Sequence, residues 1–165
     1  MFIGDVRDRE RLYWALKSVK WVIHAAALKR IEVGHYNPGE MVRTNIEGAM
    51  NVIDASIAAG TVRRAVLVST DKAVRPTSVM GASKRFAELI LQGLTERGRK
   101  PRYCIVRFGN VLDSSGSVVP VFKEQIEKGG PITVTHPEVT RYFMTIPEAA
   151  NLVIQAGAMG HGGDV

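Results

Sequence analysis

The sequence predicts an α/β fold built on a parallel sheet. Short apolar runs rich in β-branched residues alternate with longer stretches whose apolar residues recur every three or four positions. This alternation is typical of strands joined by helical crossovers. The chain has 165 residues, of which 45% are hydrophobic and 23% are charged, as in ordinary folded domains. Polar residues directly follow the strand-like runs, and ligands of such sheets bind beyond the carboxyl ends of the strands.

The elements are expected in alternating order along the chain. Strands are predicted at residues 19–26, 64–69, 103–108 and, more briefly, 132–135. Helices are predicted at residues 37–60, 79–97, 118–128 and 147–158. Gly60 and Gly98 stand where two of these helices end, and Pro147 lies in the first turn of the last one. The change to Gly- and Ser-rich loops near Gly109 is the expected domain boundary.

Composition and charge exclude several classes of protein. The net charge of +6 favours anionic partners, but the basic residues are scattered and aromatic residues are only 7%, so nucleic-acid binding is not expected. We expect no membrane-spanning segment and no signal peptide in this chain, and hence a cytoplasmic location. The single cysteine, Cys104, permits no internal disulfide, and four widely separated histidines predict no metal site.

Three polar clusters at the predicted strand ends suggest one site on one rim. Ser69, Thr70, Asp71 and Lys72 follow the second strand and bring together a hydroxyl, a carboxylate and an amine. These are groups for acid and base catalysis, although an Asp-Lys salt bridge is an alternative interpretation. Met80 and Lys84 are four residues apart, on one face of the next helix. The other two clusters are His24, Ala25, Ala26 and Ala27 after the first strand, and Phe108, Gly109, Asn110 and Val111 after the third.

Seven motifs in a fixed order carry a resemblance to a known family. They are HAAALK at 24–29, YNP at 36–38, TNIEG at 44–48, STDK at 69–72, RFGNV at 107–111, SSGSVVP at 114–120 and VTRYFMT at 139–145. The chain thereby resembles the CapD-type polysaccharide biosynthesis group of UDP-N-acetylglucosamine 4,6-dehydratases, which are extended short-chain dehydrogenase/reductases. The resemblance implies a partial doubly wound (Rossmann-type) sheet followed by part of a smaller substrate-binding subdomain.

The resemblance also implies a redox-neutral dehydration of a UDP-sugar with NAD, rather than NADP, as the cofactor. Lys72 would remove the C5 proton of the sugar, and Asp71 would donate a proton to the departing C6 hydroxyl. Thr70 would hydrogen-bond the C4 oxygen, and Lys84 would hold the nicotinamide ribose. Two alternatives stay open: a sugar-nucleotide C4 epimerase, which does not need the Asp71-Lys72 pair, and a sugar-nucleotide-binding protein without catalysis.

Further residues take their expected roles from the same resemblance. Cofactor contacts are implied for Asp5 and Val6, at the adenine, and for His24, Ala25, Ala26 and Lys84. Substrate contacts are implied for Lys29, Asn110 and Arg141.

The sequence departs from the family pattern in several ways. Met80 stands where most of the superfamily has tyrosine, and a thioether cannot accept the C4 hydroxyl proton; the membrane-anchored branch of the family also has methionine here. Asp113 replaces a usual glycine, which predicts backbone strain or a negative charge near the phosphates. No glycine fingerprint for a dinucleotide follows an N-terminal strand, and Met1 to Val6 resembles the third strand of the parent fold.

These departures predict that the chain is a fragment. Residues 1–110 would form a partial NAD-binding domain without its first strands and glycine loop, and residues 111–165 part of the sugar-nucleotide-binding subdomain. Full-length relatives would carry the membrane anchor upstream. The first strand would then expose an unpaired edge, so a homo-oligomer is expected.

Overall fold

The core of the molecule is a three-stranded parallel sheet. The computed structural model describes residues 1–98, 100–114, 118–134 and 136–165. Strands β1 (Trp21–His24), β2 (Arg64–Thr70) and β3 (Arg102–Phe108) lie in the order β1-β2-β3, with β2 parallel to both neighbours. A second parallel pair, β4 (Asn110–Val111) and β5 (Phe143–Met144), stands apart from this sheet. The predicted α/β fold class is confirmed.

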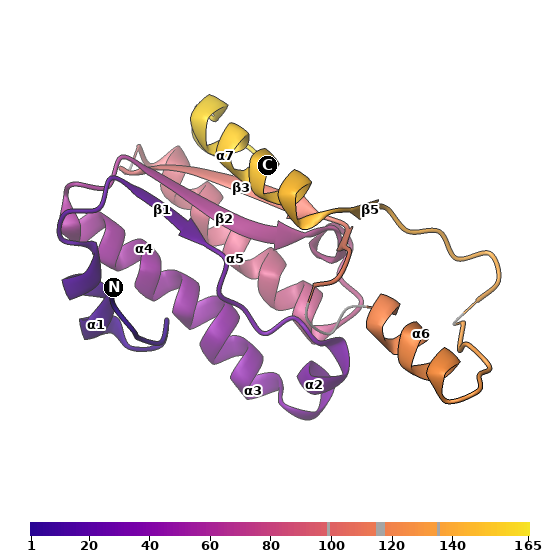
Figure 1. Cartoon of the computed structure of the whole chain (residues 1–165). Coiled ribbons are helices and arrows are strands. Elements are labelled where there is room, and N and C mark those ends of the chain that lie inside the picture. The colour runs from indigo at the N-terminus through magenta and orange to yellow at the C-terminus, as the bar shows by residue number, and fades with distance from the viewer. Residues whose placement is uncertain (99, 115–117, 135) are drawn as a thin grey trace.

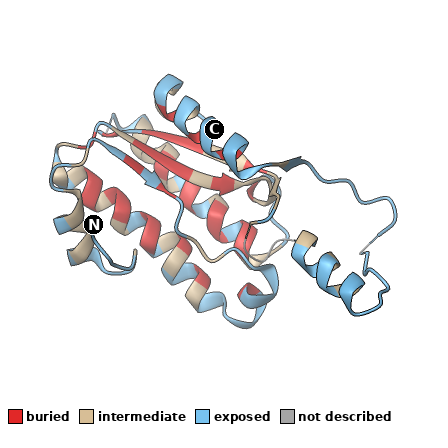
Figure 2. Ribbon diagram, in the orientation of Figure 1, coloured by how far each residue is buried: buried red, intermediate tan, exposed pale blue. Residues whose placement is uncertain are grey.

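Helices cover both faces of the main sheet (Figure 1). α1 (Arg9–Leu16), α4 (Gly48–Ala59) and α5 (Val79–Glu96) lie on one face, and α7 (Ile146–Met159) lies on the other. The buried residues follow the sheet and the inner sides of α4 and α5 (Figure 2). α6 (Val118–Glu127) extends away from the sheet and buries none of its residues.

Two apolar clusters, one on each side of the sheet, hold these layers together. The larger lies between the sheet and the α1, α4 and α5 layer, and includes Val52, Leu67, Leu91 and Tyr103. The smaller lies under α7, where Val66, Phe108 and Val153 meet. Burial of such side chains from water is the main favourable term in folding. Because both faces of β2 and β3 are covered, these two strands read as continuous apolar runs in the sequence, whereas β1 buries only alternate residues.

The predicted helix at 37–60 is a composite of three segments. α3 (Pro38–Met41), a π-helical turn (Val42–Glu47) and α4 follow one another without a break, after a short α2 (Ile31–Tyr36) that the sequence did not predict. In the wide turn, the buried Asn45 amide accepts from the Leu28 backbone N–H and donates to the Leu28 carbonyl and to Ser83 Oγ. Gly60 ends the run with φ +64°, as predicted.

Two predicted strands are absent from the described residues. Residues 132–134 form no strand, which makes the predicted strand at 132–135 wrong; Thr135 lies outside the described residues. This segment is exposed and follows Gly129 and Gly130, whose φ angles are positive. No described strand pairs with it. Residues 1–6, which resemble a strand of the parent fold, likewise form no strand, and no described strand pairs with them. α1, β4 and β5 were not predicted.

The two edges of the main sheet differ. Along β3, the C-terminal segment adds hydrogen bonds from the Gly163 N–H to the Tyr103 carbonyl (2.8 Å) and from the Ile105 N–H to the Asp164 carbonyl (2.9 Å). Along β1, no strand among the described residues pairs with the outer edge. None of the helices in the described ranges is long and apolar enough to cross a bilayer. The division into residues 1–110 and 111–165 stays a prediction.

Candidate functional site

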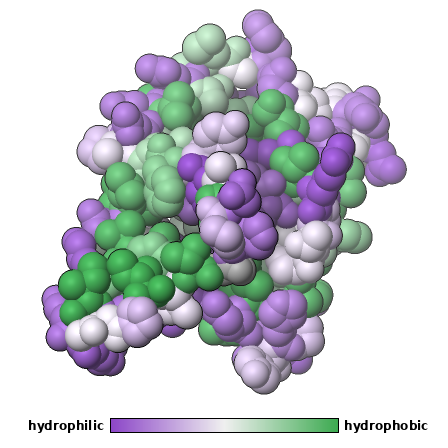
Figure 3. All heavy atoms as spheres, turned by 90° about the vertical axis from the view of Figure 1, so that its right-hand side faces the viewer, coloured by the Kyte–Doolittle hydropathy of each residue, from purple (hydrophilic) through white to green (hydrophobic). Residues whose placement is uncertain are grey.

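A cleft of about 550 Å³ opens beyond the carboxyl ends of β2 and β3. The segments that line it are the loop after β1, the end of β2, the start of α5, the residues from Phe108 to Ser114, and parts of α6 and β5. The end of the molecule toward α6 carries hydrophilic side chains at its centre, with hydrophobic ones beside them (Figure 3). Eight of the predicted site residues line this cleft: Ala25, Lys29, Thr70, Lys72, Met80, Lys84, Asn110 and Arg141.

Thr70, Asp71 and Lys72 form one hydrogen-bonded cluster. β2 ends at Thr70 and a single 3-10 turn, η2 (Asp71–Ala73), follows at once. Asp71 Oδ1 accepts from Thr70 Oγ1 at 3.0 Å and from Lys72 Nζ at 2.9 Å. Lys72 Nζ also donates to Asn110 Oδ1 at 3.3 Å, which connects the polar cluster after β2 to the polar cluster after β3. Burial raises the pKa of Asp71, but the hydrogen bonds from Lys72 and Thr70 outweigh burial and hold it below its usual value.

Gly81 brings the start of α5 against this cluster. A Cβ at residue 81 would lie 2.4 Å from the Lys72 carbonyl oxygen, so only glycine permits this close approach. Ser78 caps the helix, because its hydroxyl accepts from the Gly81 N–H at 3.1 Å. Met80 and Lys84 are thereby placed at the cleft beside Thr70.

Met80 and Lys84 are both buried at the floor of the cleft, with exposed fractions of 4% and 6%. Lys84 Nζ donates to the Val68 carbonyl at 2.6 Å. Burial lowers the pKa of Lys84 to about 8, and the nearby Glu88 carboxylate opposes this change.

His24 lies behind the cleft rather than in its lining. It faces a small internal cavity that Ser56 and Tyr103 also line, and neither His24 Nε2 nor the Tyr103 hydroxyl has a hydrogen-bond partner among the described residues. Burial, followed by the charge of Lys84, lowers the pKa of His24 to about 4. The imidazole is therefore neutral at pH 7. Ala26 is also outside the lining of the cleft.

The predicted substrate residues come from three different segments of the cleft. Lys29 Nζ donates to Ser114 Oγ at 3.2 Å, and burial lowers the pKa of this amine. Asn110 begins β4, and its backbone N–H donates to the Tyr142 carbonyl at 2.9 Å. Arg141 is exposed and reaches the cleft from the residue before Tyr142.

Asp113 has the left-handed backbone that its position predicts. Its φ of +56° is the one positive value at a non-glycine residue in the described part of the chain, a conformation that aspartate tolerates better than most residues. The strain expected from the replaced glycine is thus present. Residues 115–117 of the SSGSVVP motif lie outside the described residues.

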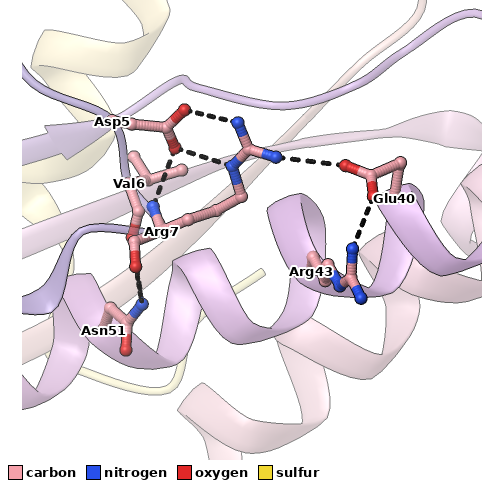
Figure 4. A network of polar contacts seen from close by, with 6 residues as sticks. All are labelled: Asp5, Val6, Arg7, Glu40, Arg43 and Asn51. Atoms are coloured by element: carbon pink, nitrogen blue, oxygen red, sulfur yellow. Dashed lines mark hydrogen bonds and ion pairs between the residues drawn. The ribbon is translucent and has the colours of Figure 1, made fainter.

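Asp5 and Val6 lie apart from the cleft, in a separate polar network (Figure 4). Both carboxylate oxygens of Asp5 accept from Arg7, which lowers the pKa of Asp5 to about 2. Arg7 also donates to Glu40 at 3.1 Å. The Val6 side chain packs closely against Gly48, where an added Cβ would lie only 2.8 Å from it. The Val6 carbonyl accepts a hydrogen bond from the Asn51 side-chain amide at 3.1 Å.

Sequence reasoning missed the most deeply buried charge near the cleft, Glu88. The available signal was a glutamate one turn after Lys84 in an apolar stretch of α5. No group of histidine, cysteine, aspartate and glutamate side chains in the described ranges is arranged to hold a metal ion.

The parallel sheet, with its polar cleft beyond the strand ends, defines a Rossmann-type α/β domain. The chain belongs to the polysaccharide biosynthesis protein family, which it matches over residues 1–165.

Curated relatives extend this assignment. The capsular polysaccharide biosynthesis protein CapD of Staphylococcus aureus is 54% identical over 99% of this chain and 27% of its own length. The inverting UDP-N-acetylglucosamine 4,6-dehydratase of Campylobacter jejuni is 40% identical over 99% of this chain and 50% of its own length. A UDP-glucose 4-epimerase of Rickettsia canadensis is also 40% identical, over 99% of this chain and 48% of its own. The chain therefore spans between about a quarter and a half of these relatives.

Solved structures show the same fold. Pen from Bacillus thuringiensis superimposes with a TM-score of 0.91 at 39% identity, over 98% of this chain and 50% of that one. DesIV from Streptomyces venezuelae, a dTDP-glucose 4,6-dehydratase solved with NAD bound, gives a TM-score of 0.88 over 98% of this chain and 55% of that one. At 22% identity, DesIV supports the fold alone.

Proposed function

We propose that this chain carries the catalytic residues of an NAD-dependent 4,6-dehydratase that acts on UDP-N-acetylglucosamine or a close relative, in surface polysaccharide biosynthesis. The observation that carries the proposal is the double contact of the Asp71 carboxylate with the Thr70 hydroxyl and the Lys72 amine. Thr70 and Lys72 line the cleft, whereas Asp71 lies just outside its lining and reaches it through these two side chains. These are the groups that an elimination needs: a proton carrier and a base. The Campylobacter jejuni relative supports this choice of substrate and reaction.

The residues at the floor of the cleft fit the nicotinamide half of NAD. Ala25 and Ala27 are the first residues after β1 that line the cleft, ahead of Leu28, and their small side chains leave room for a flat ring. The buried Lys84 amine would donate to the ribose hydroxyls, while Asp5 and Val6 would contact the adenine, with His24 and Ala26 behind the ring. When bound, NAD supplies a hydride acceptor for C4 of the sugar and returns the hydride to C6. The preference for NAD over NADP stays a prediction.

Asp71 would replace the missing tyrosine as the group that accepts the C4 hydroxyl proton. Met80 has no site for this proton, whereas Asp71 is ionised because its pKa is low. The proton would pass from the C4 hydroxyl through Thr70 Oγ1, which already donates to Asp71 Oδ1. Asp71 would then hold the proton that the C6 hydroxyl needs in order to leave as water.

Lys72 would act as the base at C5. Its ammonium would first release a proton to solvent, and the neutral amine would then remove the C5 proton, which the C4 ketone has made acidic. The electrons of the C5–H bond form the C5–C6 double bond as the C6–O bond breaks, and Asp71 gives its proton to the departing oxygen. Lys72 would return its proton to C5 at the end, so the overall change is the loss of one water. Lys29, Asn110 and Arg141 would bind the sugar-nucleotide, the two cations facing its diphosphate.

A C4 epimerase is the second candidate, and the Rickettsia canadensis relative favours it. An epimerase needs the oxidation at C4 and its reversal but no base at C5. A sugar-nucleotide-binding protein without catalysis is the third candidate. A cytoplasmic location and self-association accompany the proposal as predictions.

Mass spectrometry of the complete polypeptide with UDP-N-acetylglucosamine and NAD tests the choice between these candidates. The dehydratase proposal predicts a product lighter by one water, and an Asp71→Asn variant that forms none of it. An epimerase would leave the mass unchanged, and proton NMR of the same reaction would show the opposite configuration at C4. Uridine-nucleotide binding without any product would identify the non-catalytic alternative.

A further inference from the structure

Glu88 is a fully buried carboxylate that lies directly behind the cleft. It stands on α5, one turn after Lys84, and its exposed fraction is 0%. Both of its oxygens are fully engaged. Oε1 accepts from Ser69 Oγ at 2.5 Å and from Arg107 Nε at 2.9 Å, and Oε2 accepts from Arg107 Nη2 at 2.6 Å and from Arg85 Nη1 at 2.9 Å.

The charge of Glu88 is retained despite its burial. Burial raises the pKa of this carboxyl, but the hydrogen bonds from Arg107, Ser69 and Arg85 outweigh burial and hold the pKa below its usual value. An ionised carboxylate with a two-point contact to an arginine has a fixed orientation, because both N–H donors must be satisfied together. Glu88 is therefore a rigid anchor rather than a proton donor.

Two partners of Glu88, Ser69 and Arg107, lie on the strands that lead into the candidate site. Ser69 lies on β2 directly before Thr70 and itself lines the cleft, and Arg107 lies on β3, three residues before Asn110. Ser69 and Arg107 face each other in the register of the sheet. Glu88 thus links the ends of two strands to the helix that carries Met80 and Lys84.

We propose that Glu88 is a positioning residue: through Ser69 and Arg107 it fixes the relative placement of the Thr70–Lys72 cluster, Asn110 and Lys84. This inference rests on the proposed dehydratase function. Glu88 lies behind the cleft and touches no reacting atom, so its effect is on geometry. A small displacement of a hydrogen-bonded catalytic group costs far more in rate than in binding, since the reaction depends steeply on orientation.

Two variants and one matched control separate positioning from simple packing. Glu88→Gln keeps the shape of the side chain and removes its charge. Ser69→Ala removes one hydrogen bond and leaves the Glu88–Arg107 pair intact, so it serves if Glu88→Gln does not fold. The control is Ser56→Ala, which removes an equally buried serine hydroxyl that donates to Val52 within α4.

Kinetics and hydrogen exchange of the complete polypeptide give two independent readouts. We expect kcat to fall roughly tenfold to a hundredfold for Glu88→Gln and less for Ser69→Ala, at temperatures where each variant is folded and with little change in KM. In the double variant, Ser69→Ala adds little further loss, because both act through one contact. Ser56→Ala lowers the melting temperature and leaves kcat unchanged.

Deuterium exchange of backbone amides tests the positioning role without any turnover. If the wild-type protein turns over no UDP-sugar, that result rejects the proposed function but not the positioning role. In Glu88→Gln, residues 69–73 and 109–112 should exchange faster than in the wild type, with α4 unchanged. Unchanged exchange in these two segments, or unchanged kcat in an active enzyme, would overturn the positioning role.

Discussion

At the scale of single residues, Met80 is the clearest departure from the chemistry of the superfamily. Its side chain is buried at the cleft and has no group that accepts a proton at neutral pH. In the proposed mechanism the thioether only fills space, while Asp71 takes the proton through Thr70.

We therefore predict that Met80→Leu retains C4 oxidation within about tenfold of the wild type, because the thioether takes no part in the proton transfer and the swap conserves the packing volume. The measurement is the absorbance of reduced nicotinamide during a single turnover. Thr70→Val is the contrasting variant, and it should lose this oxidation. A complete loss in Met80→Leu would assign the thioether a direct role.

His24 gives the fold a dependence on pH. Its pKa is lowered to about 4 in the folded state, so the unfolded chain binds more protons between pH 4 and 6.5. Stability is then present above pH 6.5 and is lost as the pH falls toward 4, by roughly 3 kcal/mol for a change of this size. Urea unfolding from pH 7 to pH 4 should show this loss in the wild type, and a smaller one in His24→Leu. The exposed His35→Ala is the control, and an equal slope in all three proteins would argue against a buried neutral imidazole.

The residue scale also shows what the sequence alone predicts. Eight of the predicted site residues share one cleft, because the carboxyl ends of parallel strands meet at one edge of the sheet and their polar residues are visible as strand-terminal motifs. The placement of His24 behind the cleft, and the contacts of Glu88 with Ser69 and Arg107, depend on which side of a strand or helix faces a neighbour. That information comes from tertiary packing, which a single sequence does not contain.

At the scale of elements, the approach of α5 to the turn after β2 decides the geometry of the cleft. Gly81 permits this approach, whereas a Cβ added at Gly93, on the same helix, would have no atom within 4 Å. Alanine substitutions at the two glycines therefore test two different effects: steric contact at Gly81 and helix propensity alone at Gly93.

We predict that Gly81→Ala lowers kcat about tenfold or more, because the new Cβ displaces the Lys72 backbone. Gly93→Ala should instead stabilise the protein by about 0.5 to 1 kcal/mol and leave kcat unchanged, since alanine favours a helix over glycine. Steady-state kinetics and thermal unfolding of both variants give the comparison. Equal kinetics in the two variants would show that the contact at Gly81 does not control the site.

Predicted elements agree with the structure where a local signal is strong. The three strands of the main sheet and the helices α5, α6 and α7 lie close to their predicted bounds, because apolar periodicity, Gly98 and Pro147 mark them. Gly60 likewise marks the end of α4. The π-helical turn at Val42–Glu47 has no such signal, since it depends on the contacts of Asn45 with Leu28 and Ser83. The segment at 132–134 has the composition of a strand and lacks a neighbour to pair with.

At the scale of the whole molecule, β1 leaves one edge of the sheet without a partner among the described residues. Trp21 and Ile23 of this strand are also 44% and 50% exposed. Unpaired edges with apolar side chains favour association between chains.

We predict that the 165-residue chain on its own self-associates, and that Ile23→Lys shifts it toward the monomer. Light scattering across a dilution series measures the mass, and thermal unfolding shows whether the chain melts cooperatively. A monodisperse wild-type monomer with a cooperative melt would contradict this prediction.

Asp71 and Lys72 form an elimination pair in the proposed mechanism, and exchange of the C5 proton with solvent tests this central claim most directly. The complete polypeptide, with NAD and UDP-N-acetylglucosamine in deuterated water, should yield a product that has lost one water and carries deuterium at C5. Lys72→Ala should abolish this deuterium uptake while C4 oxidation, seen as reduced nicotinamide, continues. Deuterium at C5 in Lys72→Ala at the wild-type rate would contradict the role assigned to Lys72 and the dehydration mechanism built on it.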